Sequence, residues 1–266
     1  MFRIERPRCV SWTIPVSLVE ALAILGAGFA AGVINAIVGS GTLITFPTLI
    51  AFGYPPFLAN VSNTVGILPG IGSGINAYRR ELSGQTRRLC TLGVFSLLGS
   101  TIGSILLLQL PGAVFGHVVP VLILVACALV IAQPRLSKWL AHRHAAHPHG
   151  GLPLAGGVFL TGIYGGYFGA AQGVILISLL SIFINDELQR LNGTKQVLAG
   201  IANAVAAIMF ISFTHIAWGA AGLIAGGSIV GGHIGGRYGR LLPARILRLL
   251  IVVIGVTVAV HLLISG

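Results

Sequence analysis

The feature that most constrains this chain is a hydrophobic run that breaks at glycines and resumes at once. Residues 26–46 read GAGFAAGVINAIVGSGTLITF, and the tetrapeptide GSGT at 39–42 interrupts them. A break of this kind frees backbone N–H and C=O groups that hydrocarbon cannot satisfy, so protein or water must line it. We therefore treat the break as a candidate binding site.

The same design returns in the second half of the chain. Residues 156–180 read GGVFLTGIYGGYFGAAQGVILISLL, with a break at 169–173. Gly162 stands 130 positions after Gly32, and Gly231 stands 132 positions after Gly99. Shared spacing over whole halves indicates an internal duplication. Two interrupted hydrophobic segments at matching places in two halves are typical of the substrate site of a secondary transporter.

The composition excludes a soluble protein. Hydrophobic residues make up 55% of the chain and charged residues 8%, against roughly 25% charged residues in soluble domains. At roughly 20 residues for each span, the length of 266 residues allows about eight to ten spans. We predict an all-α, polytopic membrane protein with two homologous halves of four to five transmembrane helices, each half with a glycine-interrupted helix pair.

Ten apolar runs define the expected helices and the domain organisation. The runs are 14–38, 42–52, 57–78, 89–110 and 114–132, then 152–168, 174–184, 191–213, 218–236 and 246–264. We expect residues 1–132 to form the first transmembrane repeat, 133–151 a cytoplasmic linker rich in His and Arg, and 152–266 the second repeat.

The positive charge is better explained by membrane topology than by nucleic-acid binding. The net charge of +11 lies in short clusters between apolar runs, at 79–88, 135–143 and 237–248. The positive-inside rule makes their side cytoplasmic. All three share a side if each interrupted segment crosses twice, which gives ten crossings and inverted halves. Re-entrant half-helices would give eight crossings and parallel halves, and the sequence leaves both readings open, as it does the orientation of the N-terminus.

The residues after each break carry the chemistry of the candidate site. A helix N-terminus presents unpaired N–H groups and about half a positive charge, so it can hold an anion without a formal cation. The alternative is that the glycines only permit tight packing. Asn63 and Lys195 each begin a face of small residues on the third run of a half. The candidate substrate-binding residues are Asn35, Gly39, Ser40, Gly41, Thr42, Ser62, Asn63, Gln172, Gly173, Thr194, Lys195 and Asn203.

The histidines support weaker hypotheses. His233 lies among glycines and is a candidate for proton coupling, because histidine titrates near neutral pH. The cluster at His142, His144, His147 and His149 suggests an alternative function, a transporter of transition-metal or other cations. We expect no metal site and no cofactor, since a linker without fixed geometry does not order ligands. No Ser/His/Asp or HExxH arrangement points to an enzyme.

The order of these motifs in both halves resembles the sulfite exporter TauE/SafE family of membrane permeases. The matching residues of the first half are Gly28, Gly32, Asn35, Gly39, Ser40, Gly41, Pro47, Ala59, Ser62 and Asn63. Those of the second half are Gly162, the break at 169–173, Gly193, Thr194, Lys195, Gly231, Gly235, Arg237, Leu247 and Arg248. The resemblance implies transport of small sulfur-containing anions, such as sulfite or sulfonates, without hydrolysis of ATP. Ser40, Thr42 and residues 170–172 depart from the family's glycine-richer pattern.

An electrical argument favours export across the plasma membrane. With the cell interior negative, moving one negative charge out is favoured by about 2.3 kcal/mol per 100 mV. Glu20 is the one acid in the apolar runs, so a carboxylate relay for a coupling cation is poorly supported. The expected partners are a small anionic substrate and membrane lipids, without nucleic acid, and a homodimer is left open.

Overall fold

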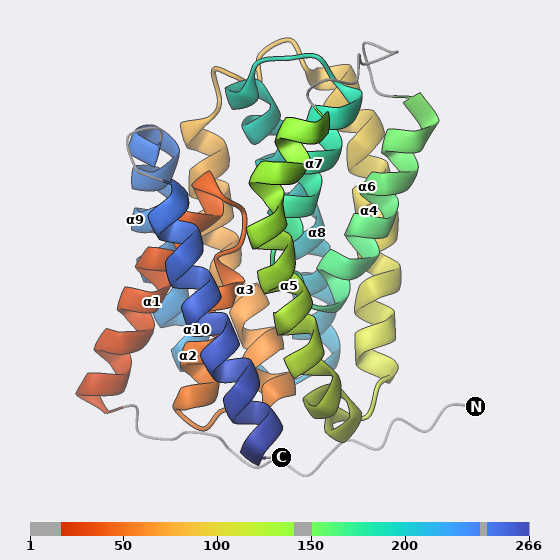
Figure 1. Ribbon diagram of the computed structural model, residues 1–266. Helices are drawn as coiled ribbons and strands as arrows, with labels where there is room; N and C mark the ends of the chain where they lie inside the picture. The colour runs from red at the N-terminus through yellow and green to blue at the C-terminus, as the bar shows by residue number, and fades with distance from the viewer. Residues whose placement is uncertain (1–16, 141–150, 240–243, 266) are drawn as a thin grey trace.

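The chain folds into a bundle of α-helices. The computed structural model describes residues 17–140, 151–239 and 244–265, and these ranges form ten helices without a strand (Figure 1). The helices are α1 (Leu18–Ile37), α2 (Thr42–Ala51), α3 (Pro56–Ala77), α4 (Thr86–Gln109), α5 (Gly112–Leu140), α6 (Gly151–Tyr167), α7 (Gln172–Phe183), α8 (Leu188–Phe213), α9 (Trp218–Tyr238) and α10 (Ala244–Ser265). The predicted fold class, an all-α polytopic membrane protein, is confirmed.

The first break turns the chain back on itself. Tyr54, which follows α2, donates a hydrogen bond of 3.1 Å to Glu20 in the first turn of α1. The start of α1 and the end of α2 therefore lie side by side, at the lower end of the bundle in Figure 1. The helix α2 has only 10 residues, about 15 Å of rise, which is half the thickness of the hydrocarbon core. The pair α1–α2 is thus a hairpin whose two ends lie at the same end of the bundle.

The second break makes a hairpin at the opposite end. A Cβ added to Gly157 in α6 would lie 3.1 Å from Leu179 in α7, so the two helices run back along each other. The start of α6 and the end of α7 lie at the upper end of Figure 1. Positive φ angles make the turns, at Gly39 (86°) in the first break and at Gly169 (74°) and Ala171 (59°) in the second.

Each half contains five helices within the described residues, which agrees with the predicted four to five helices per half. Besides the two hairpins, six helices have 21 to 29 residues each, enough to cross a membrane core. The open end of the first hairpin lies at the lower end of Figure 1 and that of the second hairpin at the upper end. The halves therefore run in opposite directions, as the reading with inverted halves requires. By length and composition alone, α1, α4, α5, α8 and α10 could each cross a membrane.

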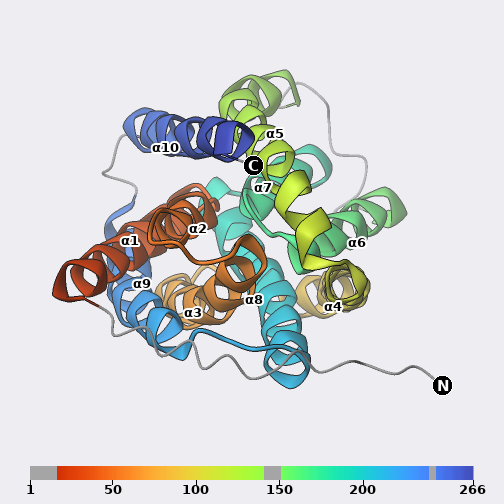
Figure 2. The same ribbon diagram turned by 90° about the horizontal axis from the view of Figure 1, so that it is seen from below.

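The two halves interlock through glycine-lined contacts. Helices α1 and α3 pack on α9, and α6 and α8 pack on α4 (Figure 2). A Cβ added to Gly231 in α9 would lie 2.0 Å from the Phe29 carbonyl oxygen in α1, and one added to Gly103 in α4 would lie 2.0 Å from that of Ile163 in α6. Only glycine permits such approach. We call α1, α3 and α9 the first body and α4, α6 and α8 the second body; each contains helices of both halves.

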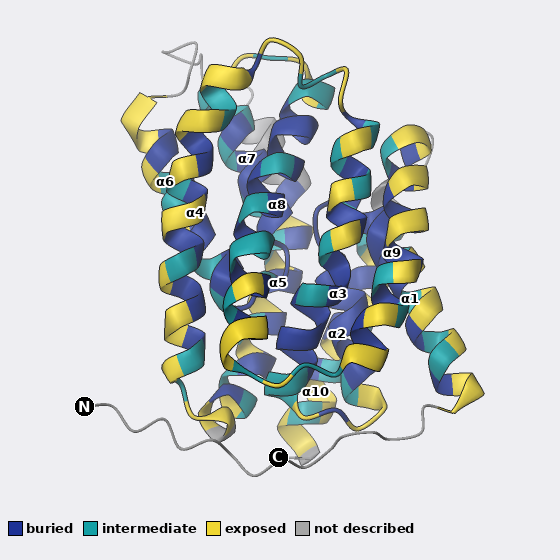
Figure 3. Ribbon diagram, turned by 180° about the vertical axis from the view of Figure 1, so that it is seen from behind, coloured by how far each residue is buried: buried dark blue, intermediate teal, exposed yellow. Residues whose placement is uncertain are grey.

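The outward surface of the bundle is apolar, as a lipid-facing surface should be. Large apolar residues such as Val94, Leu160 and Val253 are exposed, and Figure 3 shows exposed positions along the outer helices. Helix α5 continues to Leu140, into the range assigned to the linker. Residues 141–150, which include the four clustered histidines, lie outside the described residues.

Candidate functional site

The two breaks meet inside the bundle. The amide of Gly173, in the first turn of α7, donates a hydrogen bond of 3.0 Å to the carbonyl oxygen of Gly39. A Cβ added to either glycine would lie 2.5 Å from the Cα of the other. Ser40 is 1% exposed and Gln172 2%, so the junction is shut off from solvent. The re-entrant hairpins thus bring two helix N-termini, those of α2 and α7, to one buried place.

Both helix N-termini lack side-chain caps. Neither Gly41, before α2, nor Ala171, before α7, provides a capping hydrogen bond. Among the described residues no acceptor is found for the backbone amides of Ser40, Gly41, Thr42, Ala170 and Ala171. Buried amides without acceptors are rare in folded proteins. Together with the positive ends of two helix dipoles, they make the junction electropositive.

Side-chain donors at the junction are also left without partners. The Ser40 hydroxyl and the Gln172 side-chain nitrogen are buried and have no hydrogen-bond partner among the described residues. The Gln172 carbonyl oxygen accepts a bond of 3.4 Å from Asn203 on α8. This bond leaves the Gln172 amide nitrogen as a spare donor. Unsatisfied buried groups require an explanation, and a ligand with acceptor oxygens would supply one.

Lys195 brings a positive charge close to the first break. Its side chain is 0% exposed, and Nζ donates a bond of 3.3 Å to the carbonyl oxygen of Ala36 near the end of α1. Within the described ranges no carboxylate pairs with it. The negative end of the α1 dipole stabilises the ammonium in part, but a buried charge without an ionic partner remains costly. An anion bound at the junction would offset that cost.

Asn63 serves the first break in a different way. Its Nδ2 donates to the Thr42 hydroxyl at 3.4 Å, and its Oδ1 accepts a hydrogen bond from the Thr45 hydroxyl. These bonds hold the first turn of α2 against α3. The side chains of Asn63 and Thr42 therefore already have partners within the protein, unlike the Ser40 hydroxyl and the Gln172 side-chain nitrogen.

Four other candidate residues do not point clearly to the junction. The Ser62 hydroxyl accepts a bond of 2.9 Å from the amide of Ala217, which precedes α9. The Thr194 hydroxyl donates to Gln85 at 2.9 Å and to the Arg190 carbonyl at 3.1 Å. Asn35 is half-buried, and His233 is exposed on α9. The geometry thus concentrates the candidate site on the two breaks, Lys195 and Asn203.

Two residues at the junction went unnoticed in the sequence. Asn60 on α3 donates a bond of 3.2 Å to the carbonyl oxygen of Tyr167 at the end of α6, and its own Oδ1 is buried without a partner. Tyr164 donates a bond of 2.6 Å to the Ala170 carbonyl and so braces the second break. An asparagine one helical turn before Asn63 was the available signal for Asn60.

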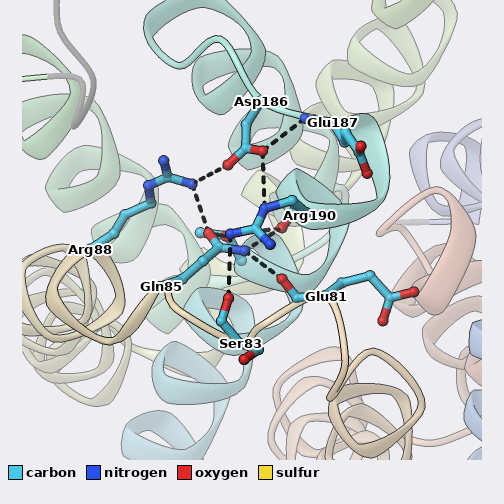
Figure 4. Close-up of polar contacts among 8 residues, drawn as sticks. Glu81, Ser83, Gln85, Arg88, Asp186, Glu187 and Arg190 are labelled. Atoms are coloured by element: carbon cyan, nitrogen blue, oxygen red, sulfur yellow. Dashed lines mark hydrogen bonds and ion pairs between the residues drawn. The ribbon is translucent and has the colours of Figure 1, made fainter.

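A cluster of charges closes the end of the bundle nearest to Lys195. The Asp186 carboxylate, between α7 and α8, accepts from Arg88 at 2.8 Å and from Arg190 at 3.0 Å (Figure 4). Gln85 accepts from Arg88 and Thr194. Burial raises the pKa of Asp186, but hydrogen bonds from Arg88, the Glu187 amide and Arg190 outweigh it and hold the pKa below its usual value. The cluster ties the turn between α3 and α4 to the corner before α8.

Comparisons with known proteins agree with this architecture. A family model described as "Sulfite exporter TauE/SafE" matches residues 24–262. The chain is 27% identical over 238 residues to "Probable membrane transporter protein ORF9" of Sinorhizobium sp, covering 89% of this chain and 90% of the relative. A "Probable membrane transporter protein" of Haemophilus influenzae is 28% identical over 220 residues, covering 82% and 85%. "Probable membrane transporter protein YfcA" of Escherichia coli K12 is 24% identical over 237 residues, covering 88% and 86%. No solved structure matches the chain.

Proposed function

Because the chain belongs to the sulfite exporter TauE/SafE family, we propose that it moves a small sulfur-containing anion, such as sulfite or a sulfonate, across the plasma membrane. The family and the names of the relatives indicate a membrane transporter rather than an enzyme. The identity of the anion, the direction and the mechanism are our proposal, and the geometry of the two breaks supports them.

One observation carries the proposal: most of the buried polar groups that lack a partner at the junction are donors. Five backbone amides, the Ser40 hydroxyl and the Gln172 side-chain nitrogen have no acceptor among the described residues. A sulfite or sulfonate group has three oxygens that accept hydrogen bonds and carries negative charge. Such a group satisfies the orphan donors and meets the positive ends of α2 and α7. A cation would face the same donors unfavourably.

Lys195 gives the site its formal charge. Its 0% exposure means that a bound anion would interact with the ammonium in a low-dielectric setting, where charges attract more strongly than in water. The flexible lysine side chain can turn from the Ala36 carbonyl towards a ligand. We therefore assign Lys195 the role of the charged anion ligand, supported by Ser40, Gln172 and Asn203.

The packing suggests how alternating access could operate. The first and second bodies contact each other at the Lys195–Ala36 bond and the Asn60–Tyr167 bond, and the Gly39–Gly173 bond joins the breaks that follow α1 and α6. Each body is held together by close glycine contacts and moves as a unit. Rocking one body against the other would expose the junction first to one side and then to the other.

We propose export as the direction. With a negative cell interior, the exit of one negative charge is favoured by about 2.3 kcal/mol per 100 mV, so the anion needs no coupling ion. Glu20, the one acid within a hairpin helix, is bonded to Tyr54 at the end of the hairpin away from the break. No carboxylate of the described residues lies at the junction to carry a coupling cation.

Flux measurements in proteoliposomes test the proposal. Vesicles with purified protein are loaded with radiolabelled sulfite, and a potassium diffusion potential is imposed. We expect sulfite efflux that exceeds the efflux from equally loaded vesicles without protein. The efflux should rise when the vesicle interior is made negative. Uptake that strictly requires a proton or sodium gradient would overturn the export direction. The absence of flux for sulfite, thiosulfate, sulfoacetate and taurine alike would overturn the assigned substrate class.

A further inference from the structure

A cavity of about 260 Å³ lies on the lateral surface of the bundle, away from the junction, between the first turns of α4 and α6. It is lined by Arg87, Arg88, Thr91, Leu92, Phe95, Gly151, Leu152 and Ala155. Its volume is several times the ~30 Å³ that one water occupies in the liquid. The transport site does not use these residues.

We propose that this cavity binds the head group of an anionic membrane phospholipid. The inference does not depend on the transported substrate. Two arginines line one part of the cavity and apolar side chains line most of the rest, the combination that a lipid phosphate and its first acyl carbons require. Basic pockets between transmembrane helices are known to bind anionic lipid head groups.

The position of the cavity fits the boundary between head groups and hydrocarbon. Arg87 and Arg88 lie in the first turn of α4, where the polar turn ends and a membrane-length apolar helix begins. Leu152, at the start of α6, is 80% exposed and Val94 on α4 is 55% exposed. The cavity therefore opens sideways towards lipid rather than inwards towards the bundle.

Arg87 supplies the charge that the lipid would engage. Its side chain is exposed, and no carboxylate among the described residues pairs with it. Arg88 points partly elsewhere, since its guanidinium also binds Asp186 at 2.8 Å. A head group at Arg87 would thus lie one residue from the charge cluster of Figure 4. Lipid binding and the stability of that cluster should be coupled.

Further along the cavity from the arginines, the lining is apolar, as an acyl chain requires. Leu92 and Ala155 are buried, and Phe95 is half-buried at the level below the guanidinium groups. Inorganic phosphate alone would contact the arginines but would leave these apolar side chains exposed to water. The apolar lining therefore favours a phospholipid over a free inorganic anion.

The test measures binding of short-chain lipids to the purified full-length protein. Dihexanoyl phosphatidylglycerol, dihexanoyl phosphatidylcholine and inorganic phosphate are titrated while the thermal unfolding temperature is followed. We expect phosphatidylglycerol to stabilise the wild type at lower concentrations than either other probe. Arg87→Gln should weaken this effect about fivefold, from roughly 1 kcal/mol for each basic residue near anionic lipid.

Two further variants make the result decisive. Arg80→Gln removes the same charge from an exposed position in the preceding turn, outside the cavity, and should bind phosphatidylglycerol as the wild type does. Leu152→Ser keeps every charge but removes an apolar side chain from the cavity wall. This variant should bind phosphatidylglycerol more weakly and inorganic phosphate as the wild type does. Equal binding of phosphatidylglycerol by Arg87→Gln and Arg80→Gln would overturn the proposal. So would equal stabilisation by phosphatidylcholine or by phosphate.

Discussion

The two breaks share a backbone design but differ in the chemistry that surrounds them. Lys195 on α8 stands 132 positions after Asn63 on α3, the spacing that relates the later anchors of the halves. Asn63 binds Thr42 and Thr45 in its own half, whereas Lys195 reaches across to Ala36 in the other half. The side chains that brace the first turn of α2 therefore come from the first half itself.

The second break remains incomplete within the protein. Gln172 keeps an unpartnered nitrogen, and Lys195 brings a charge that no carboxylate among the described residues balances. A duplicated scaffold has thus become specialised: Asn63 braces the first break, whereas Gln172 and Lys195 of the second half add to the donors that Ser40 and the backbone amides leave free. The comparison predicts that substitution of Asn63 changes stability and that substitution of Lys195 changes transport.

The contact between the breaks should be the most sensitive point. Gly39→Ala places a Cβ 2.5 Å from the Gly173 Cα at a φ of 86°, so overpacking and backbone strain add up to about 2–5 kcal/mol. Gly26→Ala, where an added Cβ meets nothing within 4 Å, is the control and should be neutral or slightly stabilising. The measurement is the thermal unfolding temperature in detergent. Equal unfolding temperatures for Gly39→Ala and Gly26→Ala would contradict the close contact between Gly39 and Gly173.

Lys195→Met should separate transport from stability. Truncating a buried, hydrogen-bonded charge at a binding site costs about 2–5 kcal/mol, so sulfite flux should fall about 100-fold. The unfolding temperature should stay level or rise, because the variant no longer buries an unpaired ammonium. Initial rates in proteoliposomes and thermal unfolding are compared on the same preparation. Flux within twofold of the wild-type value would show that Lys195 is not an anion ligand.

Asn63→Leu should show the reverse pattern. The Thr42 and Thr45 hydroxyls lose their shared partner, which should lower the free energy of unfolding by about 1–3 kcal/mol. Flux should fall by less than in Lys195→Met, since Asn63 holds the wall rather than the anion. If Asn63→Leu abolished flux at unchanged stability, the division of roles between the halves would be wrong.

The charge cluster at the outer end should have the smallest effect. Asp186→Asn weakens two partly exposed ion pairs, and such pairs contribute about 1 kcal/mol or less. Since the folded pKa of Asp186 lies below its usual value of 3.8, the contribution of Asp186 to stability is present above about pH 4 and is lost as the pH falls through the folded pKa. The stability difference between wild type and variant should be constant at neutral pH and vanish in acid. A difference that grows on acidification would contradict the pairing.

Much of the architecture was predictable because it follows from local patterns. Apolar runs bounded by glycine, proline and arginine marked all ten helices to within a few residues at most ends, although α5 runs on to Leu140. The glycine breaks were visible because hydrocarbon does not tolerate free backbone groups. Whether each short run crosses or returns was not predictable, since that choice depends on φ angles at Gly39, Gly169 and Ala171.

The sequence predicted where the candidate site lies better than it predicted the contacts of the side chains there. Residues that follow a break, such as Ser40 and Gln172, could be chosen from helix-end electrostatics. The partners of Ser62 and Thr194, in contrast, come from the residue before α9 and from the turn before α4, which no local pattern reveals. Asn60 was missed for the same reason, because its bond to Tyr167 joins residues 107 positions apart.

Locating a bound anion tests the central claim most directly. Crystals grown with 2-bromoethanesulfonate would show the bromine by its anomalous signal and so mark the ligand. We predict the sulfonate between the two breaks, within hydrogen-bond distance of Ser40, Gln172 and Lys195. A ligand bound elsewhere, with the Ser40 and Gln172 donors still unpaired, would contradict the account.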